Sequence, residues 1–322
     1  MKEYELIDSG DGRKLERFGP YVLSRPCSQA VWSPQCSKEV WEKADAFFTR
    51  EEKGEWNVST KVPERWEITI DGIVMKIQRT DFGHVGIFPE QQMCWHRLKE
   101  LTKASHRVLN LFAYSGGSTL FCAQNGAKVC HVDASNGMVQ WAKENAARNG
   151  FSHIRWIVED AIKFLKREVR RGSRYDAIIL DPPSFGRGSK GEVFKIERDI
   201  QQLLFLCKEC LEKEAAYLLF SCHTPGFTPT TLSHLLEDIF SDGEIEKGEM
   251  VLKTQVAPYS PLGDGCGKHA TSRCSSTRLK TLPSSQHLYP GSLAHPLKGN
   301  RTQLRFTGSR EVPSGCYALW RR

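Results

Sequence analysis

Hydrophobic and polar positions alternate in blocks between residues 106 and 252, and the blocks have the lengths of strands and helices. Short apolar runs bounded by turns predict buried strands, and longer segments with a helical period predict helices. Ser135 before one such helix and Gly150 after it are residue types typical of helix ends. The predicted strands are 106–112, 128–132, 154–158, 175–180 and 215–221; the predicted helices are 117–125, 136–149, 161–170, 195–211 and 229–240.

This order of elements predicts the fold class. Strands and helices that alternate at this period form parallel strands joined by right-handed crossovers. We expect an α/β fold with a doubly wound, Rossmann-like sheet and a smaller N-terminal α+β lobe. In the first hundred residues, which hold five of the eight tryptophans, strand patterns at 66–70 and 73–78 flank Asp71-Gly72, a hairpin turn signal. The segment 315–320 predicts a closing strand.

The pattern disappears from 256 to 310, where eight Lys and Arg face a single acid and Ser, Gly and Pro are frequent. We expect a basic insertion there that is a loop or disordered. Its charge could contact an RNA backbone, although a solvated segment is the favoured interpretation. The predicted domains are thus an aromatic-rich lobe (1–100), a ligand-binding domain (101–255 with 311–322) and the insertion (256–310).

Composition and charge narrow the class further. The 322 residues carry 45 Lys and Arg against 38 Asp and Glu, a net charge of +7 that permits an anionic partner without requiring one. The apolar runs are too short to span a bilayer and the first residues lack a signal-peptide core, so we expect a cytoplasmic protein without membrane contact. Eleven scattered cysteines indicate reduced thiols. The Cys207-x-x-Cys210 pair lies in a helical pattern without a second pair, so no metal site is predicted.

Two features indicate a ligand site. The segment Asn110–Ser118 joins a strand to a helix through paired glycines, which let a ligand approach the backbone at a helix N-terminus. Asp133, Asp160 and Asp181 each follow a predicted strand, so they should line the carboxyl edge of the sheet, where such folds bind ligands. Asp133 is placed to accept hydrogen bonds from a ribose diol, and Asp160 is placed to accept one from an adenine amine. Asp181 would lie nearest the reacting group. For Asp160 a simple helix N-cap explains the residue equally well.

The motifs NLFAYSGG, VDAS, KENAARN, VEDA and LDPPSF together resemble class I S-adenosylmethionine-dependent methyltransferases, in particular the bacterial 23S rRNA methyltransferase group that includes the cytosine-C5 enzymes. FGHVGIFPEQQ is similar to that group's segment before the cofactor domain, although its RNA-binding PUA domain is not evident. The resemblance implies S-adenosylmethionine as cofactor and RNA, 23S rRNA above all, as partner. The cofactor-binding residues that it implies are Phe88, Asn110, Phe112, Ala113, Tyr114, Ser115, Gly116, Gly117, Asp133, Ala134, Ser135, Asp160, Ala161 and Asp181.

The motif Asp181-Pro182-Pro183-Ser184-Phe185 resembles the loop with which methyltransferases of planar nitrogens hold an amine. There the acid and a prolyl carbonyl hold the amine while the aromatic ring stacks on the base. Cys222, after a later strand, instead resembles the nucleophile of the cytosine-C5 enzymes. Carbon 5 is too weak a nucleophile to attack a sulfonium methyl until a thiolate adds to carbon 6. A buried strand cysteine is the alternative for Cys222.

Our interpretation of the sequence is an RNA methyltransferase that acts on cytosine C5, with Cys222, Asp181, Pro182 and Phe185 as catalytic residues. One alternative is N-methylation of a base with Cys222 inert. Another is a dinucleotide-dependent oxidoreductase, which the lack of GxGxxG disfavours; a third is a non-catalytic RNA-binding relative. His84 and His223 are interpreted mainly as structural hydrogen-bonding residues. The sequence leaves open whether the protein is a monomer or a homodimer.

Overall fold

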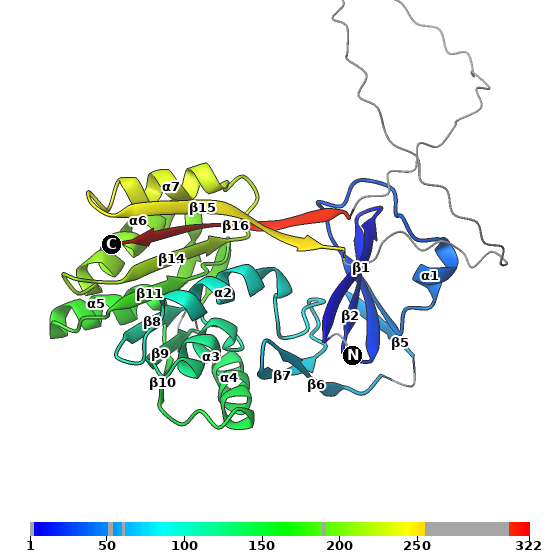
Figure 1. The fold of residues 1–322 in the computed structure, drawn as a ribbon, viewed down its shortest axis with the longest axis horizontal. Helices are drawn as coiled ribbons and strands as arrows, with labels where there is room; N and C mark the ends of the chain where they lie inside the picture. Colours follow the sequence, from blue (N-terminus) through cyan, green and yellow to red (C-terminus); the bar gives the residue numbers. More distant parts are fainter. Residues whose placement is uncertain (1–2, 51–53, 60–61, 189–190, 255–308) are drawn as a thin grey trace, which may run out of the picture.

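The structure is a computed structural model, and it describes residues 3–50, 54–59, 62–188, 191–254 and 309–322. Its largest element is a seven-stranded sheet in the order β10-β9-β8-β11-β14-β16-β15 (Figure 1). Neighbours from β10 through β14 are parallel, and β16 and β15 complete the sheet in antiparallel fashion. The strands are β8 (Arg107–Leu111), β9 (Lys128–Asp133), β10 (Ile154–Val158), β11 (Ala177–Leu180), β14 (Tyr217–Cys222), β15 (Glu244–Lys253) and β16 (Glu311–Arg321).

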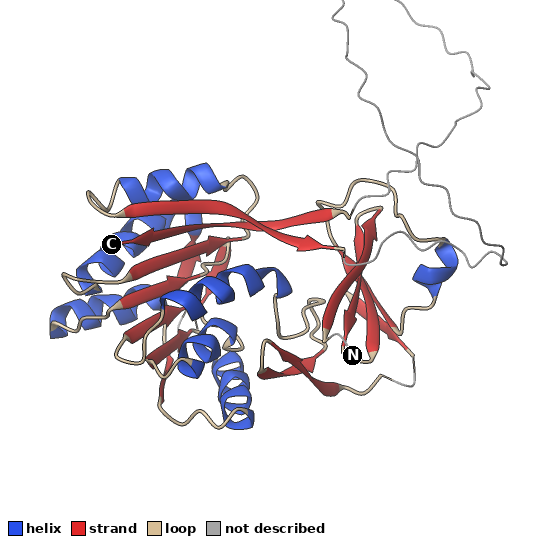
Figure 2. Cartoon of the chain, viewed as in Figure 1, coloured by secondary structure: helices blue, strands red, loops and turns tan. Residues whose placement is uncertain are grey.

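Helices cover both faces of this sheet, as the predicted doubly wound fold requires (Figure 2). One face packs on α2 (Gln92–Leu101), α3 (Gly117–Gln124) and α4 (Asn136–Arg148). The other packs on α5 (Ala161–Arg171), α6 (Ile196–Cys210) and α7 (Pro229–Glu237). Because strand side chains alternate, consecutive residues such as Val108 and Leu109 contribute to different cores. The strand order reverses between β8 and β11, the place where open α/β sheets bind ligands. The predicted fold class is confirmed.

The N-terminal part is built on a five-stranded sheet in chain order, with a separate hairpin after it. Asp71 and Gly72 turn the hairpin with positive φ angles of 49° and 85°, as the sequence predicts. The elements are β1 (Tyr4–Gly10), β2 (Arg13–Phe18), β3 (Tyr21–Pro26), α1 (Lys38–Glu42), β4 (Ala46–Thr49), β5 (Glu55–Val58), β6 (Arg65–Ile70) and β7 (Ile73–Gln78). Ile68 of the hairpin and Leu120 of α3 belong to one buried core, which joins the hairpin to the large sheet. The predicted domain boundary at residue 100 therefore stays a prediction.

The two longest strands, β15 and β16, reach across to the N-terminal sheet (Figure 1). Thr254, just after β15, bridges to Leu6 of β1, and a small apolar cluster buries Leu6 against Leu252 and Val312. Thr254 also pairs with Arg310: its N–H donates to the Arg310 carbonyl at 2.9 Å, and its hydroxyl accepts from the Arg310 N–H at 2.8 Å. The predicted insertion at 256–310 lies outside the described residues except for its last two.

The described residues contain no membrane-spanning helix, no cluster of metal ligands and no disulfide. The helices of the described ranges include none with the length and apolar character needed to cross a membrane. Across those ranges, no group of three or more His, Cys, Asp and Glu side chains could hold a metal ion. The described cysteines are all free thiols, and Cys207 and Cys210 are buried in α6.

Candidate active site

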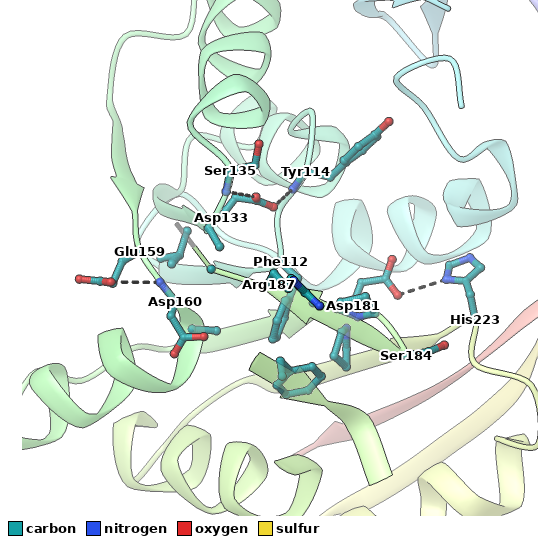
Figure 3. Close-up of a pocket in the computed structure, with 18 of the residues that line it drawn as sticks. Phe112, Tyr114, Asp133, Ser135, Glu159, Asp160, Asp181, Ser184, Arg187 and His223 are labelled. Carbon is teal, nitrogen blue, oxygen red and sulfur yellow. Dashed lines mark hydrogen bonds and ion pairs between the residues drawn. The ribbon is translucent and has the colours of Figure 1, made fainter. Parts of the chain in front are cut away.

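A cavity of about 500 Å³ opens at the carboxyl ends of β8, β9, β10 and β11, where the strand order reverses (Figure 3). Its wall combines aromatic and apolar side chains with four carboxylates. The lining residues are His84, Phe88, Phe112, Tyr114, Val132, Asp133, Ala134, Ser135, Glu159, Asp160, Ala161, Asp181, Pro182, Pro183, Ser184, Gly186, Arg187, Gly188, Phe194, His223 and Thr224.

The turn from β8 into α3 forms one wall and follows an unusual backbone path. Phe112, Tyr114 and Gly116 all have left-handed φ angles, of 54°, 51° and 96°. The turn is held by its neighbours: Asn145 donates a side-chain hydrogen bond to the Ser115 carbonyl at 2.9 Å. Gly116 is required because of its φ, and because a Cβ there would lie 3.1 Å from that of Ala142. The turn therefore presents backbone and aromatic groups to the cavity.

Not every residue of this motif lines the main cavity. Phe112 and Tyr114 do, whereas four other residues predicted here line a narrow adjoining cavity that also reaches Phe88 and Asp181. Those others are Asn110, Ala113, Ser115 and Gly117. Asn110 is buried and donates to the Thr119 hydroxyl at 2.9 Å, which ties β8 to α3. Gly116 lines neither cavity and acts through the backbone path.

Asp133 ends β9 and faces the main cavity. Its carboxylate accepts hydrogen bonds from the Tyr114 and Ser135 N–H groups, both at 2.9 Å, so it links the first turn to the second. Burial raises the pKa of Asp133, and the two N–H donors oppose that shift. Ala134 follows it in the cavity wall, and Ser135 caps α4 by accepting from the Met138 N–H.

Asp160 lies at the end of β10, and it is both a helix N-cap and a residue of the cavity wall. Its Oδ1 accepts from the Lys163 N–H at 2.9 Å, which makes it the N-cap of α5. The residue also lines the cavity beside Ala161, and the Glu159 carboxylate lies next to it (Figure 3). The N-cap role does not compete with ligand binding, because it occupies one of two oxygens.

Asp181 follows β11 at the opposite side of the cavity. Its Oδ2 accepts from the Gln91 amide at 3.0 Å, and its Oδ1 lies 3.3 Å from Nδ1 of His223. Pro182 and Pro183 continue the wall. Phe185 does not line the cavity: it is 49% exposed in β12 (Phe185–Arg187), and its ring centre lies 5.6 Å from the Arg187 guanidinium carbon.

Cys222 lies outside the cavity lining, contrary to the expectation that its thiol faces the Asp181 loop. Every residue of β14 is buried, and alternate side chains enter opposite cores. Ser221 faces Gln91, whereas Cys222 joins Leu218 and Phe220 in the core beneath α6 and α7 and is 1% exposed. Burial raises the pKa of the Cys222 thiol. The structure therefore groups Asp181 and Pro182 but separates Cys222 and Phe185 from them.

Two histidines that the sequence did not single out as functional lie in the cavity wall. They flank Phe88, with ring centroids 5.2 Å (His84) and 5.7 Å (His223) from its ring. Burial lowers the pKa of His84 to about 4. Burial also lowers the pKa of His223, but Asp181 and Glu90 outweigh it and raise that pKa to about 9. No local pattern distinguishes these histidines, since their surroundings come from distant segments.

Comparison with known proteins decides the family. A family model described as S-adenosylmethionine-dependent methyltransferase matches residues 30–241. The chain belongs to this methyltransferase family. A crystal structure of a SAM-dependent methyltransferase from Agrobacterium tumefaciens agrees with it at 33% identity and a TM-score of 0.80, covering 99% of this chain and 90% of that one. The methyltransferase SMU.776, solved with S-adenosylhomocysteine, shares the fold at 21% identity and a TM-score of 0.64, covering 77% and 69%.

Curated relatives are longer than the matched region. The ribosomal RNA large subunit methyltransferase K/L of Alteromonas mediterranea is 34% identical over 51% of this chain and 23% of its own length. The large subunit methyltransferase K of Neisseria meningitidis is 28% identical over 72% of this chain and 67% of its own. The chain thus spans 23% of the length of the first of these methyltransferases and 67% of the second. The oxidoreductase alternative is wrong, because the family and the solved neighbours are methyltransferases.

The cofactor of this methyltransferase is S-adenosylmethionine, and the cavity fits it. Asp133 and Asp160, at the ends of β9 and β10, could accept hydrogen bonds from the ribose and the adenine. Phe112 and Phe194 both line the cavity with ring centroids 5.3 Å apart, and they would supply apolar surface for the nucleoside. The predominance of carboxylates suits a cationic sulfonium.

Proposed function

We propose that this methyltransferase modifies a base of large-subunit ribosomal RNA, and that the acceptor atom is an amine nitrogen of the base. The RNA class is supported by the names of the relatives, which are ribosomal RNA large subunit methyltransferases. The atom is supported by one observation: the Asp181 carboxylate, held by Gln91, lies in the cavity wall while the Cys222 thiol lies in the opposite core. We propose a cytoplasmic location as well, which an rRNA substrate would support.

The proposed chemistry uses a few groups of the chain. S-adenosylmethionine, when bound, supplies a methyl group on a sulfonium that is open to attack by a nitrogen lone pair. Asp181 accepts a hydrogen bond from the target N–H, and the Pro182 carbonyl accepts a second, so the amine is oriented and made more electron-rich. The wall of Phe88, Phe112 and Pro183 excludes water from the transfer.

Base access is supported by the rim of the cavity. Phe185 and Arg187 lie together on β12, and Phe185 is half exposed. An exposed aromatic ring beside a guanidinium can stack on an unpaired base and contact its phosphate. The target base must be single-stranded or flipped, because a base inside a duplex cannot reach a buried cofactor.

The test is methyl transfer from radiolabelled S-adenosylmethionine to in vitro transcribed 23S rRNA, with the modified nucleoside identified by mass spectrometry. An N-methylated base is expected. Asp181→Ala should lower kcat at least about a hundred-fold and Gln91→Ala about ten-fold. Gln92→Ala is the matched control, because Gln92 bonds Asp71 on the surface instead.

A 5-methylcytosine product would contradict the nitrogen assignment. RNA binding without transfer to any rRNA would instead favour the non-catalytic RNA-binding relative.

A further inference from the structure

The ring of His223 lies between two carboxylates that come from different parts of the chain. Its Nδ1 is 3.3 Å from Asp181 Oδ1, and its Nε2 is 3.6 Å from Glu90 Oε1. Figure 3 shows the imidazole directed at Asp181 from the end of β14. Glu90 is buried, whereas the His223 side chain is 30% exposed toward the cavity. The histidine therefore connects a buried acid with the acid of the methyl-transfer site.

The charges around His223 favour its protonated form. The groups that face it are Asp181 after β11, Glu90 in the 3-10 turn η1 (Pro89–Gln91) and, more weakly and with opposite sign, Lys14 of β2. The apolar ring of Phe88 also lies beside it. Within the described residues, Glu90 Oε2 has no hydrogen-bond partner. A buried carboxylate in this state is stabilised by nearby cations, and because His223 and Arg25 both act on Glu90, loss of the His223 charge would weaken that compensation.

The same short turn fixes the second oxygen of Asp181. Gln91, next to Glu90, places its amide nitrogen 3.0 Å from Asp181 Oδ2 and 3.0 Å from the Ser221 hydroxyl. Asp181 Oδ2 is thus held directly from η1 by the Gln91 hydrogen bond, while its Oδ1 faces His223 as an ion pair; within the described residues neither Asp181 Oδ1 nor His223 Nε2 has a hydrogen-bond partner. A hydrogen bond on one oxygen and an ion pair on the other together restrict rotation of the carboxylate more than the hydrogen bond alone would.

We propose that His223, anchored by Glu90, is a positioning residue that keeps the Asp181 carboxylate oriented to receive the target amine. This inference rests on the proposed function, since it concerns the same acid. The Asp181 carboxylate can accept a hydrogen bond from the amine only when its oxygens face the cavity, and His223 supports that orientation. The histidine acts through Asp181 and is not required to touch substrate.

The test compares the wild type with His223→Asn and Glu90→Gln in methyl transfer to in vitro transcribed 23S rRNA between pH 6 and 10. His223→Asn keeps a neutral donor near Asp181 and should lower kcat by about ten- to a hundred-fold. S-adenosylhomocysteine affinity, measured by calorimetry, should stay near the wild-type value. Wild-type kcat should fall as pH rises through about 9, and Glu90→Gln should move that decline to lower pH. A His223→Asn enzyme with wild-type kcat and an unchanged alkaline limb would overturn the proposal.

A second readout separates this inference from the proposed function. NMR titration of the histidine rings in the full-length protein needs no RNA, and the resonance lost in His223→Asn identifies His223. It should titrate well above His84, and Asp181→Asn and Glu90→Gln should each lower its pKa. Titration near the ordinary value of about 6.5 would refute the paired imidazolium. The expected titration in an enzyme that methylates no rRNA would contradict the proposed function alone.

Discussion

Ser221 and Cys222 are consecutive in β14, yet their side chains lie in different cores of the protein. Ser221 faces Gln91 at 3.0 Å on the side of the Asp181 carboxylate, and Cys222 packs under α6 and α7 with Cys316 nearby. Two-residue alternation along a strand makes this separation unavoidable. The Cys222 thiol therefore lies outside the cavity lining, although it accepts at 3.4 Å from the N–H of Thr224, which is a lining residue.

Removal of the Cys222 sulfur should accordingly leave the chemistry intact. Cys222→Ala is expected to keep kcat within about threefold of wild type and to lower the free energy of unfolding by about 1–2 kcal/mol, the cost of a small cavity. Cys316→Ala is the matched control, since Cys316 is buried in the same core on the paired strand. Methyl transfer assays and urea unfolding measure both effects. An inactive Cys222→Ala beside an active Cys316→Ala would restore the thiolate mechanism.

The two roles of Asp160 can be separated by a serine. Serine caps helices about as well as aspartate, so Asp160→Ser should change the stability of α5 by only a few tenths of a kcal/mol. It removes the carboxylate that faces the cavity, and S-adenosylhomocysteine affinity should fall by about tenfold. Thr228→Ala, which removes the cap of α7 away from the cavity, should do the opposite. Calorimetry and thermal melting report the two effects; unchanged affinity in Asp160→Ser would leave the residue with a capping role alone.

Gly116 should be more sensitive to a methyl group than a comparable glycine elsewhere. Gly150→Ala introduces strain at φ +70° in open space, for which we expect about 1 kcal/mol of destabilisation. Gly116→Ala adds crowding by Ala142 to strain at φ +96°, so it should lose more stability and also weaken cofactor binding by disturbing the turn. Thermal unfolding and calorimetry of the two variants test this difference. Equal behaviour of both variants would show that the turn tolerates displacement.

Two histidines held in the neutral form, His131 buried and His84 partly buried, should make the protein sensitive to mild acid. Burial lowers the pKa of His131 to about 3 and that of His84 to about 4. Below about pH 6.5 the unfolded chain binds protons that the folded chain excludes, so stability falls as pH decreases from 6.5 toward 4. Each such group contributes up to about 1.4 kcal/mol per pH unit. Urea unfolding at pH 7 and 5 should show this slope, and His131→Asn should reduce it; an identical slope in the variant would contradict the assignment for His131.

Local signals explain why the α/β half was predictable. Apolar runs, helix caps and glycine stops lie within a few residues of each boundary, so the predicted segment 154–158 agrees with β10 and 136–149 with α4 within one residue. Parallel strands share a carboxyl edge, and this placed Asp133, Asp160 and Asp181 in one cavity.

The remaining features depend on contacts that a local pattern does not contain. All six residues of β14 are buried, so no alternation shows which face Cys222 takes, and an error of one residue reverses the answer. In the N-terminal sheet, Glu16 and Arg25 are buried as an ion pair, with Arg25 Nε 2.8 Å from Glu16 Oε2, and their charges hide β2 and β3 from a hydrophobicity pattern. Gln91 meets Asp181 across 90 positions of the chain.

The hydrogen bonds between Thr254 and Arg310, one between backbone groups and one to the Thr254 hydroxyl, close the end of the β15–β16 pair. The pairing of β15 with β16 is complete up to Thr254 and from Arg310 onward. It therefore does not depend on how many residues connect the two strands. A change in the length of that connection is therefore expected to leave the hydrogen-bond register from Glu244 to Arg321 unchanged.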